Sequence, residues 1–77
     1  MKVEILSPEA SLFAGEAEYV FLPGADGSLG ILNNHAPLIT ALKKGSVRLT
    51  TSEGEKKFEV KGGTVEVANN KVVILAE

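Results

Sequence analysis

Apolar and polar residues alternate along most of the chain, which is the period-two pattern of half-buried β-strands. In the first run Val3 and Ile5 alternate with Lys2 and Glu4, and Ser7-Pro8-Glu9 ends it because proline cannot extend a strand ladder. Further strands are expected at residues 11–14, 18–22, 38–42, 47–52, 57–61, 65–67 and 71–76. We expect Gly15 to end the second of these runs. No segment of useful length shows a helical period.

Two of the expected strands are apolar on both faces. Residues 18–22 place Tyr19 and Phe21 on one face and two aliphatic residues on the other, and residues 71–76 read KVVILA. A strand that is apolar on both faces belongs in the middle of a sheet or beneath a partner. We therefore expect both segments to be central or covered.

The connections between the strands carry recognisable turn signals. Asn69-Asn70 predicts a two-residue hairpin, since asparagine tolerates the left-handed conformation that such a turn requires. Residues 52–55, SEGE, predict a second hairpin loop, and Gly62-Gly63 predicts a bulge or a corner where the chain passes between sheets. Many short strands with frequent turns predict an all-β fold, either an antiparallel sandwich or a flattened barrel.

The stretch from Gly24 to Thr40, GADGSLGILNNHAPLIT, differs from the rest of the chain. It holds three of the eight glycines, adjacent asparagines and the only histidine. Local chemistry predicts a bent and partly exposed segment between strands. Any specialised function is expected here.

Length and composition exclude several classes of function. The 77 residues form one domain, 1–77, whose core must be thin, so a deep catalytic cleft is not expected. The net charge is −2 and the eight Lys and Arg residues are dispersed, which makes nucleic acid a poor partner. There is no cysteine, so neither a disulfide nor a thiolate metal site is expected, and a cytosolic setting is favoured. The sequence shows no signal peptide and no membrane span, so any membrane association is expected to be indirect.

Catalytic chemistry finds little support in the sequence. His35 has no second histidine and no nearby acid, and base catalysis needs an orienting partner and a pocket. We expect it to pack beside Pro37 and to hydrogen-bond a loop carbonyl. The glycines of the 24–30 stretch lack the Lys-Ser/Thr of a phosphate loop. No catalytic, cofactor-binding or metal-ligating residue is expected.

An ordered set of motifs runs through the whole chain: FAGE at 13–16, LPG at 22–24, GSLGIL at 27–32, HAPL at 35–38 and VRL at 47–49. In this order and spacing the chain resembles the amino-terminal domain of the epsilon subunit of the F-type ATP synthase. The resemblance implies a non-catalytic, flattened antiparallel β-sandwich of about ten short strands in the central stalk of the rotary enzyme. The implied partners are the gamma subunit and the ring of c subunits, and the role is to couple proton flow to ATP synthesis.

The resemblance also suggests where partners bind. It places the segment from Ser28 to His35, with Ser7 nearby, toward the c-ring and the foot of gamma. The interface candidates are Ser7, Ser28, Asn33, Asn34 and His35. For the two asparagines, a simple turn is an equally good explanation. By the same resemblance, Leu29 and Ile31 form the buried side of a strand.

Two departures separate this chain from the family pattern. Many relatives have Pro-Gly before the histidine and an acidic residue at the position of Ser28, and many continue into two C-terminal helices that inhibit ATP hydrolysis or bind ATP. We therefore expect no inhibitory role.

The implied location is the cytoplasmic face of a bacterial plasma membrane, reached through the complex. The alternatives are a free-standing adaptor that binds ligands or peptides along a strand edge and, last, a small hydrolase that uses His35.

Overall fold

The computed structural model describes all 77 residues, which form nine β-strands and no helix. No helical segment is therefore available to cross a membrane. The strands are β1 (Lys2–Leu6), β2 (Ser11–Glu16), β3 (Tyr19–Gly24), β4 (Gly27–Leu32), β5 (Leu38–Leu42), β6 (Gly45–Thr51), β7 (Gly54–Val60), β8 (Gly63–Ala68) and β9 (Lys71–Ala76). The prediction of an all-β chain is confirmed.

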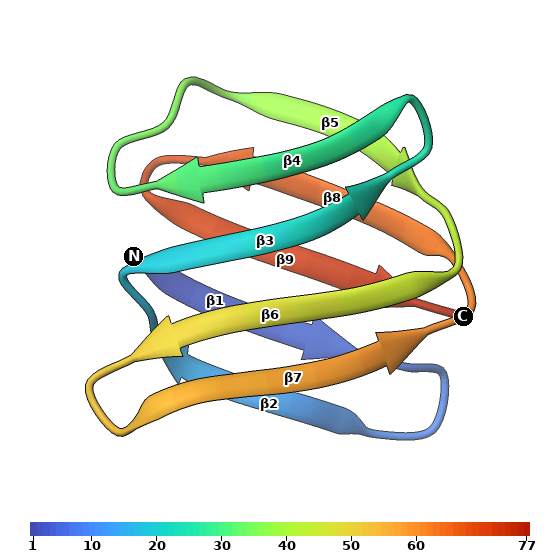
Figure 1. Ribbon diagram of the computed structural model, residues 1–77, viewed down its shortest axis with the longest axis horizontal. Coiled ribbons are helices and arrows are strands. Elements are labelled where there is room, and N and C mark those ends of the chain that lie inside the picture. The colour runs from blue at the N-terminus through green and yellow to red at the C-terminus, as the bar shows by residue number, and fades with distance from the viewer.

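The strands form two layers that face each other (Figure 1). One layer has the order β4-β3-β6-β7 and the other has the order β5-β8-β9-β1-β2. The layers are joined where β3 meets β5, through the pair Gly24 and Leu42. The result is the β-sandwich expected from the strand pattern, curled so that β3 of one sheet remains bonded to β5, the edge strand of the other.

One strand pair is parallel. The first strand, β1, runs beside the last strand, β9, from the pair Lys2 and Lys71 to the pair Leu6 and Leu75. All other pairs are antiparallel, as expected. Side chains alternate in the same way in both kinds of pair, so the sequence pattern could not reveal this one. Because β9 lies between β1 and β8, the prediction of a central position for this apolar strand is confirmed.

The space between the layers is filled almost entirely by aliphatic side chains. Alternate residues of each strand point inward, and no polar or charged residue is buried. The largest fully buried side chains are Ile5, Leu22, Ile31, Leu49, Ile74, Val3, Val20, Val47, Val65, Val67 and Val72. The alternation read from the sequence thus identifies the core face of nearly every strand.

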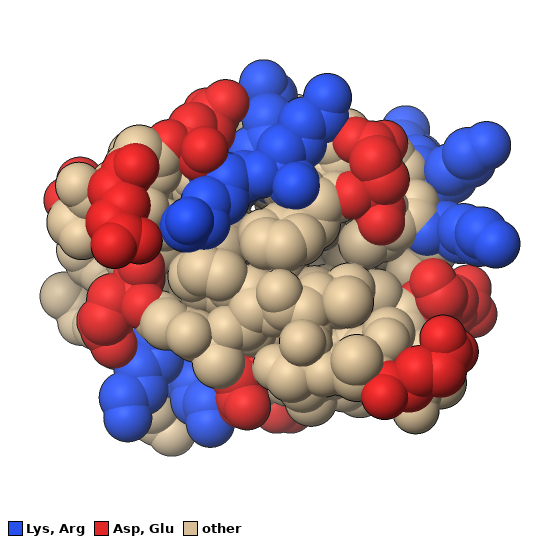
Figure 2. Space-filling model, turned by 90° about the horizontal axis from the view of Figure 1, so that it is seen from below, with Lys and Arg blue, Asp and Glu red and all other residues tan.

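The open side of the sandwich lies between the edge strands β2 and β7. Phe13 and Phe58 meet there, with ring centroids 5.9 Å apart and a tilt of 57° between the ring planes. Figure 2 looks onto this side and shows an uncharged area surrounded by lysine, arginine and acidic side chains. The two rings therefore close the core where no strand joins the two sheets.

The corner between the layers is made by Gly62 and Gly63, which connect β7 in one sheet to β8 in the other. Their φ angles are +152° and +135°, a region that side-chain-bearing residues rarely adopt. A Cβ atom on Gly63 would overlap the main-chain carbonyl oxygen of Leu75. The predicted passage between sheets is confirmed, and it requires glycine.

The remaining turn predictions have mixed outcomes. Asn69 and Asn70 have φ angles of 52° and 57°, so the predicted two-residue hairpin is confirmed. The prediction that Gly15 ends a strand is wrong, because β2 continues to Glu16. Gly15 pairs with Val3 through the main chain, and the Phe13 ring occupies the space where a Gly15 side chain would project.

Candidate protein interface

Four of the five interface candidates lie along one edge of the sandwich. Ser28 is exposed on β4, the outermost strand of the four-stranded sheet, and Asn33, Asn34 and His35 are exposed in the loop that follows it. Figure 1 shows this strand and loop at the top of the molecule. The structure therefore brings these four residues onto one side, spread over the length of β4.

Ser7 lies apart from the other four, in the turn between β1 and β2. Its hydroxyl accepts a hydrogen bond from the main-chain N–H of Ala10 at 3.1 Å, and its oxygen lies 3.2 Å from the Ala10 carbonyl, to which it donates. The preceding residue, Leu6, pairs with Leu75 on the five-stranded sheet. Ser7 thus borders the outer face of that sheet and not the β4 edge.

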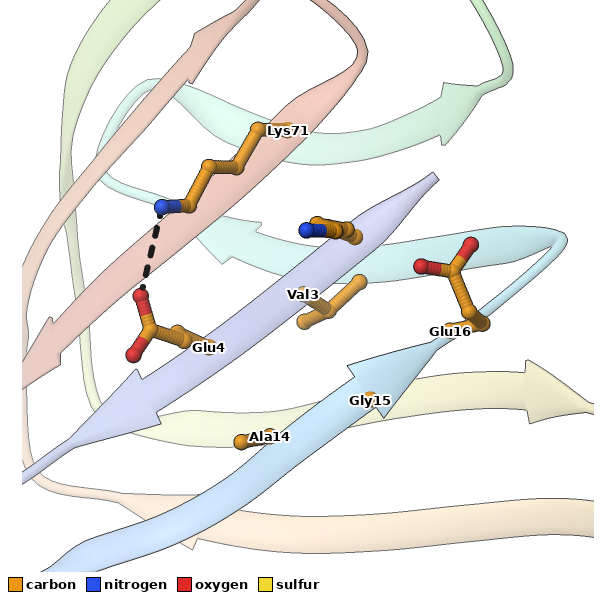
Figure 3. Close-up of a pocket in the computed structure, with 7 residues that line it drawn as sticks. Val3, Glu4, Ala14, Gly15, Glu16 and Lys71 are labelled. Carbon is orange, nitrogen blue, oxygen red and sulfur yellow. Dashed lines mark ion pairs between the residues drawn. The ribbon is translucent and has the colours of Figure 1, made fainter.

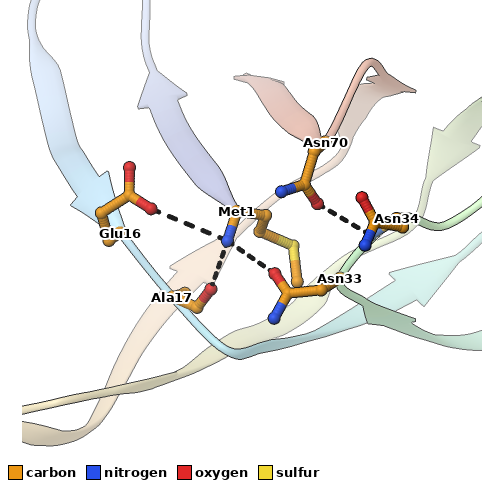
Figure 4. A network of polar contacts seen from close by, with 6 residues as sticks. All are labelled: Met1, Glu16, Ala17, Asn33, Asn34 and Asn70. Carbon is orange, nitrogen blue, oxygen red and sulfur yellow. Dashed lines mark hydrogen bonds and ion pairs between the residues drawn. The ribbon is translucent and has the colours of Figure 1, made fainter.

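Asn33 is part of a network around the amino terminus (Figure 4). The Met1 ammonium group donates to the Asn33 Oδ1 at 2.7 Å and to the Ala17 carbonyl at 2.9 Å, and it lies 3.7 Å from the Glu16 carboxylate. The Met1 side chain is buried in the core. A buried charge requires hydrogen-bond acceptors, so Asn33 has a structural role in holding the loop after β4.

Asn34 has a conformational role. Its φ angle is +62°, which asparagine tolerates better than most residues, and its main-chain N–H donates to the Asn70 Oδ1 at 2.8 Å. The side chain of Asn70, in the hairpin between β8 and β9, therefore holds the loop that follows β4. The turn explanation for the two asparagines is supported by these contacts, and their outer atoms remain exposed.

Replacing Asn33 with alanine should lower the stability of the 77-residue chain by about 1–2 kcal/mol, because a hydrogen bond to a charged group is lost. Urea unfolding followed by circular dichroism measures this change. The matched control is Asn34→Gly, which keeps both the positive φ and the main-chain donor. Equal stability of the two variants would show that the ammonium contact contributes nothing.

His35 is exposed, and its Nδ1 donates to the neighbouring Ala36 carbonyl oxygen at 2.7 Å. The carbonyl can only accept, so this contact places a proton on Nδ1. The expected bond between the histidine and a loop carbonyl is confirmed. The Nε2 atom makes no hydrogen bond within the protein.

The most apolar surface is the outer face of the five-stranded sheet. Ile39 on β5 is 73% exposed and Leu75 on β9 is 52% exposed. Two rows of paired residues run across this face. They are Ile39, Glu66, Val73 and Glu4, and then Ala41, Thr64, Leu75 and Leu6. Exposed apolar side chains that are contiguous on a small protein mark an interaction surface.

Within these two rows, Glu66 is the one charged residue without an ion-pair partner. Glu66 sits between Ile39 and Val73 and takes part in none of the four ion pairs of the protein. Glu4, in the same row, is paired with Lys71 at 3.5 Å. Two shallow hollows of about 340 and 220 Å³ flank Glu66. The face is therefore suited to apolar side chains accompanied by one positive charge.

The outer face of the four-stranded sheet is better covered. The Arg48 guanidinium lies 4.5 Å above the centre of the Phe21 ring, and the Tyr19 ring covers Gly30. Only Leu32 among its large apolar residues is strongly exposed. The two faces of the sandwich thus differ, and the five-stranded one is the better candidate for a broad contact.

The sequence reading did not single out Ile39 or Leu75. The available signal was the two-faced apolar character of residues 71–76, which fits both a central strand and a covered one. The structure shows that the strand is central: Val72 and Ile74 fill the core, while Leu75 faces outward and is exposed.

A further hollow, of about 340 Å³, lies between β1 and β2 (Figure 3). Ala14 and Gly15 form its wall because they have little or no side chain, and Lys2, Glu4, Glu16 and Lys71 surround it. The positive and negative charges balance. Its lining holds no histidine, serine, threonine or cysteine, and Glu4 is held in an ion pair with Lys71, so its arrangement does not resemble a catalytic site.

Comparison with known proteins agrees with this geometry. A family model described as the beta-sandwich domain of the ATP synthase delta/epsilon chain matches residues 1–77. An ATP synthase epsilon chain of Desulfitobacterium hafniense is 47% identical over 75 residues, which are 97% of this chain and 57% of the relative. An ATP synthase epsilon chain of Chlorobium limicola is 44% identical over 77 residues, covering 99% of this chain and 88% of the relative.

Two solved structures share the fold. One is the Euglena gracilis mitochondrial ATP synthase, OSCP/F1/c-ring, with a TM-score of 0.88 and 17% identity over 96% of this chain and 48% of that chain. The other is the central stalk and c-ring of the Tetrahymena thermophila mitochondrial ATP synthase, with a TM-score of 0.80 and 18% identity over 97% and 61%. The chain thus spans about half the length of several proteins it matches.

Proposed function

The chain belongs to the β-sandwich family of ATP synthase delta and epsilon chains, and we propose on this basis that it is a rotor part of a proton-translocating F-type ATP synthase. It binds the gamma subunit and the ring of c subunits and couples proton flow to ATP synthesis. It is non-catalytic. When the isolated 77-residue chain is added to its ATPase, ATP hydrolysis is not inhibited. Within the complex, the chain lies at the cytoplasmic face of a bacterial plasma membrane.

The observation that carries the proposal is the exposed apolar face of the five-stranded sheet. Ile39 and Leu75 are too exposed to stabilise the isolated sandwich, and apolar side chains of this size stabilise a complex when a partner removes them from water. Gamma packs against this face, and a lysine or arginine of gamma meets the unpaired Glu66. Ser7, at the margin of the face, completes the contact.

The β4 edge supplies the contact with the c-ring and the foot of gamma. Ser28, Asn33, Asn34 and His35 place polar groups along it, and the Ser28 hydroxyl makes no hydrogen bond within the protein. Short polar side chains on a rigid strand and loop suit contacts with short polar loops of a ring. Since Ser28 is uncharged, this contact relies on hydrogen bonds.

Binding to purified gamma of the same organism tests the proposal. The 77-residue chain is expected to bind gamma at micromolar concentration in calorimetry. Leu75→Lys should weaken binding at least tenfold, because the variant loses the apolar contact of Leu75 and its new positive charge repels the basic residue of gamma. Ser52→Lys, in the exposed hairpin between β6 and β7, adds the same charge away from both proposed contacts; it is the control and should bind normally. No binding by the unmodified chain would exclude the stalk role.

A further inference from the structure

The β4 strand has an open edge. It is hydrogen-bonded to β3 on one side only. In an antiparallel strand both main-chain polar groups of a residue point to the same side, and successive residues alternate. The Pro23 carbonyl accepts a hydrogen bond from the Lys43 N–H at 2.9 Å, so the main-chain carbonyl of Pro23 points away from β4. The main-chain N–H and C=O groups of Leu22 and Val20 therefore point toward β4.

This alternation fixes which residues of β4 are free. Leu29 and Ile31 face Leu22 and Val20 and form the bonded pairs. The N–H and C=O groups of Ser28, Gly30 and Leu32 consequently point away from the sheet. The Leu32 carbonyl also accepts, at 3.2 Å, the N–H that closes the following turn. An extended strand placed beside β4 would find a regular row of donors and acceptors.

The other sheet edges carry features that discourage such pairing. β7 has the sequence GEKKFEV, with four charged residues, and Figure 2 shows charged side chains around the β2 and β7 side. β2 follows Pro8 and ends on Glu16, and β5 follows Pro37. β4 reads GSLGIL, with no charge and no proline. Charges and prolines protect natural edge strands from pairing. β5 is also uncharged but directly follows Pro37, so β4 is the least protected edge.

We infer that β4 is a self-association site, at which β4 of a second copy pairs antiparallel to form one continuous eight-stranded sheet. A two-fold axis through Gly30 places Ser28 opposite the partner's Leu32, so the three free residues of each strand become hydrogen-bonded pairs. The exposed Leu32 and the half-buried Leu29 would both be covered. Gly30 carries no side chain that would hinder the approach on the axis.

The charges at the ends of β4 favour a second copy in this register. Two-fold pairing brings Asp26, in the turn before β4, near Asn34 and His35 of the other copy. Asp26 takes part in none of the four ion pairs, and the Nε2 atom of His35 is not engaged by its bond through Nδ1. An acid therefore meets a histidine at both ends of the paired strands.

Self-association would occupy the side proposed for the c-ring, a consequence that rests on the proposed function. Ser28, Asn34 and His35 would be covered in the dimer, whereas the apolar face with Leu75 would stay open. The free chain would then be a dimer that must dissociate to reach the ring. The dimer itself does not depend on the stalk assignment.

Sedimentation equilibrium of the purified 77-residue chain tests the inference. The apparent mass should rise from 8.1 kDa toward twice that value between about 10 µM and about 1 mM, as expected for a small interface. Ser28→Pro removes a donor that the monomer does not use, and Leu32→Lys places a charge on the edge. Both should remain monomeric over this range.

Leu75→Lys is the matched control, since it places the same charge at a similarly exposed leucine on the other sheet. It should dimerise like the unmodified chain, the reverse of its effect on gamma binding. If Ser28→Pro fails to fold, Leu32→Lys decides the result. A monomer at all concentrations, a dimeric Leu32→Lys chain or a monomeric Leu75→Lys chain would each overturn the inference.

Discussion

Gly63→Ala should destabilise the domain by about 2–6 kcal/mol and leave much of it unfolded at room temperature. The φ angle of +135° costs a side-chain-bearing residue about 1–3 kcal/mol. The new Cβ would also overlap the Leu75 carbonyl, and relieving such a contact costs about 1–3 kcal/mol more. The obstacle is the main chain of β9, which cannot move without disturbing the centre of the sheet. Thermal unfolding followed by circular dichroism measures the loss.

Gly54→Ala separates the two contributions. Gly54 also has a positive φ, +106°, but a Cβ there would meet no atom within 4 Å. This variant should lose only the conformational part, about 1–3 kcal/mol. If Gly63→Ala were no less stable than Gly54→Ala, the corner between the sheets would be looser than the structure indicates.

Ile31→Ala should destabilise the domain by about 2–5 kcal/mol, the usual cost of removing a large aliphatic side chain from a packed core. Ile31 is only 1% exposed and lies opposite Val20 in the centre of the sandwich. A domain of this size has a thin core, so the cavity would have few neighbours able to fill it. The free energy of unfolding in urea gives the value directly.

Leu29→Ala is the internal comparison for this prediction. Leu29 lies two residues earlier on the same face of β4 but is only partly buried. Its replacement should cost clearly less, since water already reaches part of the side chain. A smaller loss for Ile31→Ala than for Leu29→Ala would contradict the placement of β4 over the core.

The strands were largely predictable because period-two alternation reflects burial on one face. Val47 and Leu49 point inward as their spacing indicates, and Val65 and Val67 do the same. The corner at Gly62-Gly63 was predictable because a glycine pair marks a conformation that other residues avoid. Gly15 was misread because a glycine can also sit inside a regular strand when a neighbouring ring uses the free space.

Contacts between distant segments could not be predicted in this way. Alternation says which face is buried but not which strand is the neighbour, so the pairing of β1 with β9 left no trace in the pattern. The hydrogen bond from Met1 to Asn33 and the one from Asn34 to Asn70 likewise join residues more than thirty positions apart. The motifs placed four interface candidates on one edge, whereas Ser7 proved to belong to another part of the surface.

The pairing of β1 with β9 has a consequence for the synthesis of the protein. During translation β1 leaves the ribosome before β2–β8, whereas its inner neighbour β9 emerges only after them. Until then Val3 and Ile5 lack one side of their packing, and β8 lacks the partner that joins it to β1. The sandwich therefore closes only after β9 has emerged, and a nascent chain that stops before residue 71 leaves its core open to water.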